Sequence, residues 1–113
     1  DVGNSAIAKG CDVRGEVKNS VLSYDTTIGE GASVAYSVLM PGAVVEPGAV
    51  VQYAIVGEKC RIGRFAQVGA PPESAADPDS WGIAVLGPGT VVAEGEVVRP
   101  KAMLDRHHGE VEA

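Results

Sequence analysis

Aliphatic residues recur along the middle of this chain at a fixed spacing, which is the main structural signal in the sequence. Between residues 17 and 68 the steps from one aliphatic to the next are 5, 6 and 6 residues, so each position returns every 17 residues. The positions form three columns: Val17, Val34, Val51 and Val68; Leu22, Leu39 and Val56; and Ile28, Val45 and Ile62. Such a period predicts a solenoid, in which each coil buries its apolar side by stacking on its neighbours.

Small residues follow these columns at equally regular distances. They are Ser20, Ser37 and Ala54 after the first column, Thr26, Ala43 and Cys60 after the second, and Ala32, Ala49 and Ala66 after the third. Side chains that face a narrow interior must alternate large and small to fill it without overpacking. Gly31, Gly48 and Gly57 fall in the intervening turns, where glycine adopts a positive φ at low cost. Three columns per coil predict an all-β fold, a parallel β-helix shaped as a triangular prism.

The repeat resembles the hexapeptide repeat of single-stranded left-handed parallel β-helices. The left hand is implied by this resemblance, because parallel crossovers in general are right-handed. The alternative is an antiparallel sandwich of short strands. The regular period and the lack of an Asn-Gly or Asp-Gly hairpin signal favour the solenoid.

The repeat also divides the chain into segments of a single β-helix domain. We expect an imperfect first coil over residues 1–16, regular coils over 17–68, a loop excursion over 69–82, a final coil over 83–104 and a polar tail over 105–113 that frays. The final coil has Glu96 where the pattern asks for a small residue, so we expect it to be looser. The chain begins without Met and close to repeat text, which indicates a domain of a longer protein.

Three residues outside the aliphatic columns have a predicted structural role. Trp81, the only tryptophan, is expected to pack the excursion against an outer face, with a partner contact as the alternative. Counting back by one period places Cys11 on the third column, whereas Cys60 lies on a small-residue column. The two cysteines then lie on different tracks about three coils apart, too far for a disulfide, so we expect both to be reduced.

Charge and hydropathy exclude two classes of partner. The 113 residues carry a net charge of −6, which argues against binding to nucleic acid or to an anionic membrane. No apolar run approaches the length of about 18 residues that a membrane-spanning helix needs. We therefore expect a cytoplasmic protein with no nucleic-acid or membrane partner.

The histidines limit which solenoid enzymes fit. His107 and His108 are the only two, and both follow the last aliphatic, Leu104. A γ-type carbonic anhydrase needs three zinc-binding histidines from neighbouring coils, which this pair cannot supply. Hexapeptide acyltransferases use a histidine between coils as a general base. We expect both histidines to lie in a solvated tail, and we predict no catalytic residue and no metal site in this chain.

One group of basic residues is a candidate binding site. Lys59, Arg61 and Arg64 flank the core residue Ile62 and could hold a phosphate or carboxylate. Lys59 and Arg61 do not lie on core columns, so we expect these two to face outward. The alternative is a surface patch that balances the acidic background. Arg99, Lys101 and Arg106 form a second, weaker group.

Five stretches of the chain carry a family resemblance: residues 4–22, which include Asn19-Ser20-Val21-Leu22, and residues 37–43, 53–58, 69–73 and 81–85. They resemble the C-terminal domain of bacterial ADP-glucose pyrophosphorylase, also called glucose-1-phosphate adenylyltransferase. In that family an N-terminal nucleotidyltransferase domain converts ATP and glucose 1-phosphate to ADP-glucose and pyrophosphate with Mg²⁺. That domain is absent from this sequence, so no catalytic residue carries over.

The resemblance also implies partners for this chain. In that family the β-helix packs against the catalytic domain, contacts other subunits of a homo- or hetero-tetramer, and shares in binding a small-molecule allosteric effector. We therefore expect an assembly and regulatory domain that acts in glycogen biosynthesis and has no activity of its own. The alternatives are the β-helix of another sugar-nucleotide pyrophosphorylase, or a free-standing hexapeptide acyltransferase.

Overall fold

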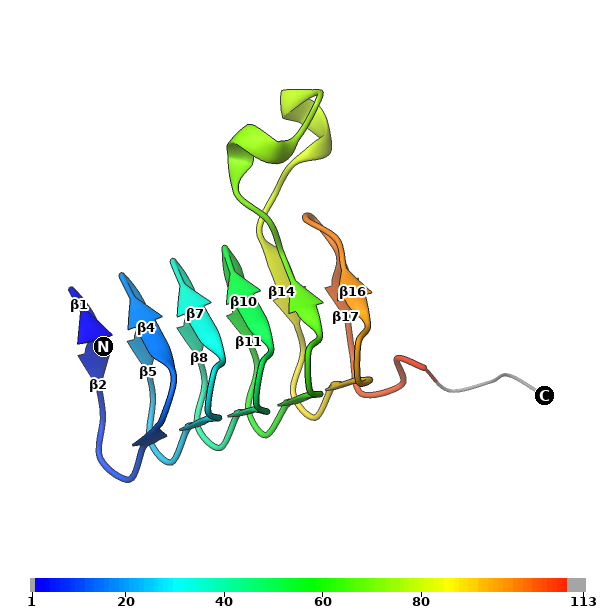
Figure 1. Ribbon diagram of the computed structural model, residues 1–113. Helices are drawn as coiled ribbons and strands as arrows, with labels where there is room; N and C mark the ends of the chain where they lie inside the picture. The colour runs from blue at the N-terminus through cyan, green and yellow to red at the C-terminus, as the bar shows by residue number, and fades with distance from the viewer. Residues whose placement is uncertain (1, 110–113) are drawn as a thin grey trace.

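The chain is a parallel β-helix, of the left-handed type that the hexapeptide resemblance implies, with three sheets forming the sides of a prism. The computed structural model describes residues 2–109. All strand pairs in these residues are parallel, and successive strands along the chain belong to the three sheets in turn. Figure 1 shows the coils stacked side by side along one axis, with the excursion projecting between β13 and β14. The predicted fold class is confirmed.

The strands are two or three residues long and belong to three sheets, which we call A, B and C. Sheet A contains β1 (Val2–Gly3), β4 (Glu16–Lys18), β7 (Ser33–Ala35), β10 (Val50–Gln52), β13 (Gln67–Val68) and β16 (Val97–Val98). Sheet B contains β2 (Ala6–Ile7), β5 (Val21–Leu22), β8 (Val38–Leu39), β11 (Ala54–Val56), β14 (Ala84–Leu86) and β17 (Met103–Leu104). Sheet C contains β3 (Asp12–Val13), β6 (Thr27–Ile28), β9 (Val44–Val45), β12 (Arg61–Ile62) and β15 (Val91–Val92).

The predicted columns form the core of the prism. All ten aliphatic positions are at most 1% exposed, and the predicted small residues are at most 3% exposed. The register agrees, because Val17 pairs with Val34, Val34 with Val51, and Val51 with Val68. Fully burying each aliphatic side chain contributes about 1.5–3 kcal/mol, so this ladder is the main source of stability.

The first coil differs from the prediction. Val13, and not Cys11, pairs with Ile28, because only two residues separate β3 from β4 where four separate β6 from β7. The coil is therefore 15 residues long, as the pairing of Val2 with Val17 shows. This shift places Cys11 on the small-residue column that contains Cys60, so the prediction of two different tracks is wrong. Both thiols are free, and at about 4.8 Å per coil they lie too far apart for a disulfide.

The turn glycines divide into two kinds. Gly31 and Gly48 have φ of 75° and 77°, as predicted. Gly57 was expected to share this conformation but is not among the positive-φ residues. It is instead a buried position of close approach, where an added Cβ would lie 2.6 Å from the carbonyl oxygen of Leu86.

The excursion leaves the prism between sheets A and B and contains two short 3-10 helices, η1 (Pro72–Ser74) and η2 (Pro78–Ser80). Trp81 closes its base, because its indole Nε1 donates to the carbonyl of Ala70 at 2.7 Å. The same ring meets Tyr53 edge-on with centroids 5.7 Å apart. The predicted packing of Trp81 against an outer face is confirmed.

Residues 106–109 of the predicted polar tail form a turn. The amide of His108 donates to the carbonyl of Asp105, and the amide of His107 donates to the Asp105 carboxylate, both at 2.9 Å. His108 also folds back onto Glu96, and its side chain is 25% exposed, so it is not the solvated side chain that was expected. Residues 110–113 lie outside the described part of the chain.

Candidate docking face

The outer surface of sheet B is one continuous apolar row. The outward residue of each strand pairs in register with that of the next coil, so the side chains lie above one another along the solenoid. The row consists of Ala6, Val21, Val38, Ile55, Val85 and Met103. Its members Val21, Val38, Ile55 and Met103 are 45%, 36%, 40% and 80% exposed. We call this row the sheet B face.

The other two sheets present mixed surfaces at the same positions. The outward row of sheet C is Asp12, Thr27, Val44, Arg61 and Val91, and that of sheet A is Glu16, Ser33, Val50, Gln67 and Val97. Both rows contain charged or polar residues, which keep a surface hydrated. Only the sheet B face has the contiguous apolar character that marks an interaction surface on a soluble protein.

Aromatic residues line the corner between sheets A and B. Asn19, Tyr36 and Tyr53 take up the same corner position in successive coils, with left-handed φ of 49°, 52° and 50°. Because the two tyrosines recur one period apart, their rings stack in parallel with centroids 4.8 Å apart. Trp81 caps this stack at Tyr53. Partial burial raises the pKa of Tyr53, with smaller contributions from Tyr36 and Glu73, so its hydroxyl stays protonated at neutral pH.

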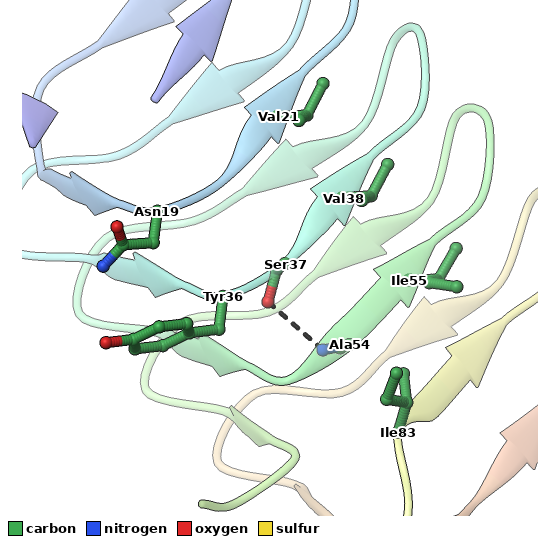
Figure 2. A pocket seen from close by; sticks show the side chains of 8 residues that line it. All are labelled: Asn19, Val21, Tyr36, Ser37, Val38, Ala54, Ile55 and Ile83. Atoms are coloured by element: carbon green, nitrogen blue, oxygen red, sulfur yellow. Dashed lines mark hydrogen bonds between the residues drawn. The ribbon is translucent and has the colours of Figure 1, made fainter. Parts of the chain in front are cut away.

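Two shallow hollows follow the sheet B face. The larger, of about 350 Å³, lies between the face and the tyrosine corner, and Figure 2 shows Tyr36, Val38, Ile55 and Ile83 along it. The second, of about 280 Å³, lies over the first two coils, and both contain Val21 in their lining. The face is thus an apolar strip with two shallow hollows along it.

The three basic residues predicted as an anion site lie along one side of a single coil. Lys59 lies in the turn before β12, Arg61 points outward from β12, and Arg64 lies in the turn after it. All three are exposed, as was predicted for Lys59 and Arg61. The guanidinium of Arg61 donates to the carboxylate of Glu46, one coil earlier, at 2.7 Å. Lys59 and Arg64 therefore lie at two different corners of the prism. Arg61 lies between them, and its charge is already paired with that of Glu46.

The buried cysteine and the two histidines, which are the other candidates for chemistry, make contacts within the fold. The Cys60 thiol is buried and donates to the carbonyl of Gly87 at 3.1 Å; burial raises its pKa, which makes it a poor nucleophile. His107 and His108 belong to the turn after β17, and His108 pairs with Glu96. Among residues 2–109, no three His, Cys, Asp or Glu side chains gather closely enough to hold a metal ion. No helix in this part of the chain is long and apolar enough to cross a membrane.

The sheet B face was not predicted from the sequence, although the sequence carries a signal for it. The residue directly before each second-column aliphatic is apolar in every coil, from Val21 before Leu22 to Met103 before Leu104. The residues before the other columns include Glu16 and Arg61. A comparison of the outward positions column by column would have identified the face.

Comparisons with known proteins agree with the fold and give it a family. Residues 1–92 match the family described as GlmU-like, C-terminal hexapeptide. Glucose-1-phosphate adenylyltransferase of Clostridioides difficile (strain 630) is 50% identical over 44 residues, which are 39% of this chain and 11% of that protein. The enzyme of the same name from Bacillus cytotoxicus is 33% identical over 104 residues, which are 92% of this chain and 20% of that protein.

Among solved structures, the acetyltransferase domain of PglB from Neisseria gonorrhoeae FA1090 covers 92% of this chain and 53% of its own, with 16% identity and a TM-score of 0.44. The chain spans about a fifth or less of the length of the adenylyltransferases that it matches. The match over residues 1–92 and the prism of stacked coils show that the chain belongs to the GlmU-like C-terminal hexapeptide family.

Proposed function

We propose that this chain is the assembly and regulatory domain of a glucose-1-phosphate adenylyltransferase, a cytoplasmic enzyme of glycogen biosynthesis. The parent protein would join ATP and glucose 1-phosphate to give ADP-glucose and pyrophosphate. The names of the relatives and the family match support this proposal. The matched stretches make up 11% and 20% of those relatives, so the chemistry and its Mg²⁺ are assigned to a nucleotidyltransferase domain outside this chain.

The sheet B face is the observation that carries the assembly role. A row of six apolar side chains with no charge among them costs free energy while it faces water, at about 25 cal/mol for each Å². Its proposed occupant is the nucleotidyltransferase domain of the same polypeptide. That domain would have the size to cover the face, since about four-fifths of the relative from Bacillus cytotoxicus lies outside the match. The mixed surfaces of sheets A and C are then left for other subunits of a tetramer.

We propose that the regulatory role belongs to Lys59, Arg61 and Arg64, which would bind an anionic small-molecule effector. The three side chains are exposed along one coil, and Lys59 and Arg64 project from its corners. An anion would have to displace Glu46 from Arg61 to use all three. Lys59→Ala with Arg64→Ala should raise the effector concentration for half-maximal response at least severalfold, and an unchanged response would remove these residues from the proposal.

The direct test of the proposed function uses the intact parent protein. Pyrophosphate release from glucose 1-phosphate is measured with ATP, GTP, UTP and dTTP offered separately. Release that requires ATP is the expected result. Release with another nucleotide would keep the domain role but move the protein to a different sugar-nucleotide pathway. Acetyl-CoA turnover without any pyrophosphate release would replace the proposal with an acyltransferase.

A further inference from the structure

His108 lies on a core column that holds small residues in the coils before it. Its backbone amide donates to the carbonyl of Asp105, three residues earlier, at 2.9 Å. The same bond within the turn is made by the fully buried residues Ala43, Cys60 and Thr90. His108 also follows Leu104 by four residues, as Thr90 follows Leu86. Residues 105–108 therefore form the ordinary turn between sheets B and C, and His108 takes its inward position.

Glu96 takes the inward position of the neighbouring corner, between sheets C and A. Since Val97 pairs with Gln67, the residue before it belongs to the column of Ala32, Ala49 and Ala66, all of which are buried. A carboxylate on such a column needs polar partners. The Oε1 of Glu96 accepts a hydrogen bond from the backbone amide of Ala93 at 2.9 Å, and its Oε2 pairs with Nε2 of His108.

The contact between Glu96 and His108 crosses the end of the apolar interior. The two columns line different corners of the prism, so side chains that meet from them must reach toward each other across its inside. One coil earlier the same columns hold Ala66 and Thr90, which are fully buried and too short to meet in this way. The side chains of His108 and Glu96 are 25% and 27% exposed, as expected for groups at the boundary between the core and water.

The first coil shows that this arrangement is not common to both ends. Its inward residues include Ile7 and Val13, which pair with Leu22 and Ile28 of the next coil. Both are apolar, and Ile7 is 37% exposed although it points toward the core. The pair of Glu96 and His108 is therefore a particular feature of the last coil.

We propose that Glu96 and His108 form a polar end cap that closes the C-terminal end of the interior. A solenoid needs a polar face on its terminal repeat, because an open end offers apolar surface and strand edges to other chains. A further coil, or the end of a second copy, that stacked on β16 and β17 would bury both polar side chains, at a cost that alanine and threonine do not carry. Partners of this domain then bind to the sides of the prism. The cap does not depend on the proposed enzyme.

Sedimentation velocity of the intact protein tests the cap. The cap variant is Glu96→Ala with His108→Thr, which gives both columns the residue types of the preceding coil. The matched control is Glu94→Ala with His107→Thr, the same changes at exposed positions of the same two turns. Over about a hundredfold range of concentration, wild type and control should keep one sedimentation coefficient, while the cap variant should shift to larger species as its concentration rises.

Two further measurements separate an open end from an unfolded coil. The cap variant should keep the circular dichroism spectrum of wild type and bind the dye anilinonaphthalene sulfonate about twofold more strongly, because its end is now apolar. A cap variant that sediments like wild type at every concentration would overturn the proposal. Loss of the β spectrum would overturn it too, because the pair would then hold the coil together. Equal association of the matched control would assign the effect to the lost charge and not to the end of the prism.

Discussion

The hydroxyl of Ser37 accepts a hydrogen bond from the backbone amide of Ala54, one coil further along, at 3.2 Å (Figure 2). The same hydroxyl donates to the carbonyl of Ala35 at 2.9 Å, and the amide of Ser37 itself donates to the hydroxyl of Ser20. Serine at this corner therefore links each coil to the next. The hydroxyl ladder ends at Ala54, and the amide of the following corner residue, Ala84, donates to the carbonyl of Tyr53.

Replacing Ser37 by alanine should cost about 1–3 kcal/mol of unfolding free energy. The reason is that the amide of Ala54 would be left buried without its acceptor. Urea unfolding followed by circular dichroism measures the loss. Ser33→Ala, on the outer side of β7, is the matched control and should change stability by less than about 0.5 kcal/mol. Equal effects of the two substitutions would show that the ladder contributes little.

Val51→Asp should prevent the middle coils from folding. Val51 is fully buried, so the substitution places an unpaired charge in the interior of the prism, at a cost of roughly 4 kcal/mol or more. Val50→Asp is the control on the same strand, because Val50 points outward on sheet A. Soluble expression and thermal melting are the measurements. A stable Val51→Asp variant would contradict the assignment of the central column.

The excursion should tolerate shortening if its anchor is kept. Replacing residues 72–80 by two glycines leaves Ala70 and Trp81 in contact and should change stability by less than about 1 kcal/mol, since loop closure depends weakly on length. Trp81→Ala should cost about 1–3 kcal/mol, because it removes the contact with Tyr53 and the hydrogen bond at the loop base. Melting curves that collapse after the shortening alone would mean that η1 and η2 support the coils.

The Glu96 pair predicts a loss of stability in acid. A carboxylate whose pKa is lower when folded stabilises the fold above its unfolded pKa, and this contribution is lost as the pH falls through the folded value. The difference in unfolding free energy between wild type and Glu96→Gln should therefore be largest well above pH 4.5, the ordinary pKa, and shrink below it. Its expected maximum is about 1 kcal/mol. A difference that does not depend on pH would rule out an ionised Glu96 as the cause.

The core of this fold could be predicted because each coil repeats the same packing problem. Val51 and Ile62 face the same narrow interior as their counterparts one period away, so the spacing alone assigns them to the core. The first coil was misplaced, because its shortened turn moves Cys11 from the third column to the column of Cys60. The aliphatic pattern carries a sign of this change, since Val13 lies four residues before Val17 where Ile28 lies six residues before Val34.

The sites were harder to predict than the fold. The pairing of Glu96 with His108 joins residues from two different turns, and it forms because both side chains point into the last coil. Likewise, the carboxylate of Glu46 pairs with the guanidinium of Arg61, because residues 15 apart can lie on adjacent coils. The sequence of the basic group alone did not indicate this ion pair. Residues on the core columns are fixed by the period, whereas these contacts depend on the conformation of individual side chains.

In the proposed function the sheet B face holds the rest of the parent protein, and one pair of variants tests this contact. Val38→Glu with Ile55→Glu places two charges on the face, while Val91→Glu places one on the outer side of sheet C. The measurement is the thermal unfolding of the intact parent by calorimetry, together with its ADP-glucose synthesis. We predict that the face variant separates into two transitions and loses activity at least tenfold, with the β-helix still folded, while Val91→Glu resembles wild type. A face variant that melts in one transition at the wild-type temperature with full activity would contradict the account.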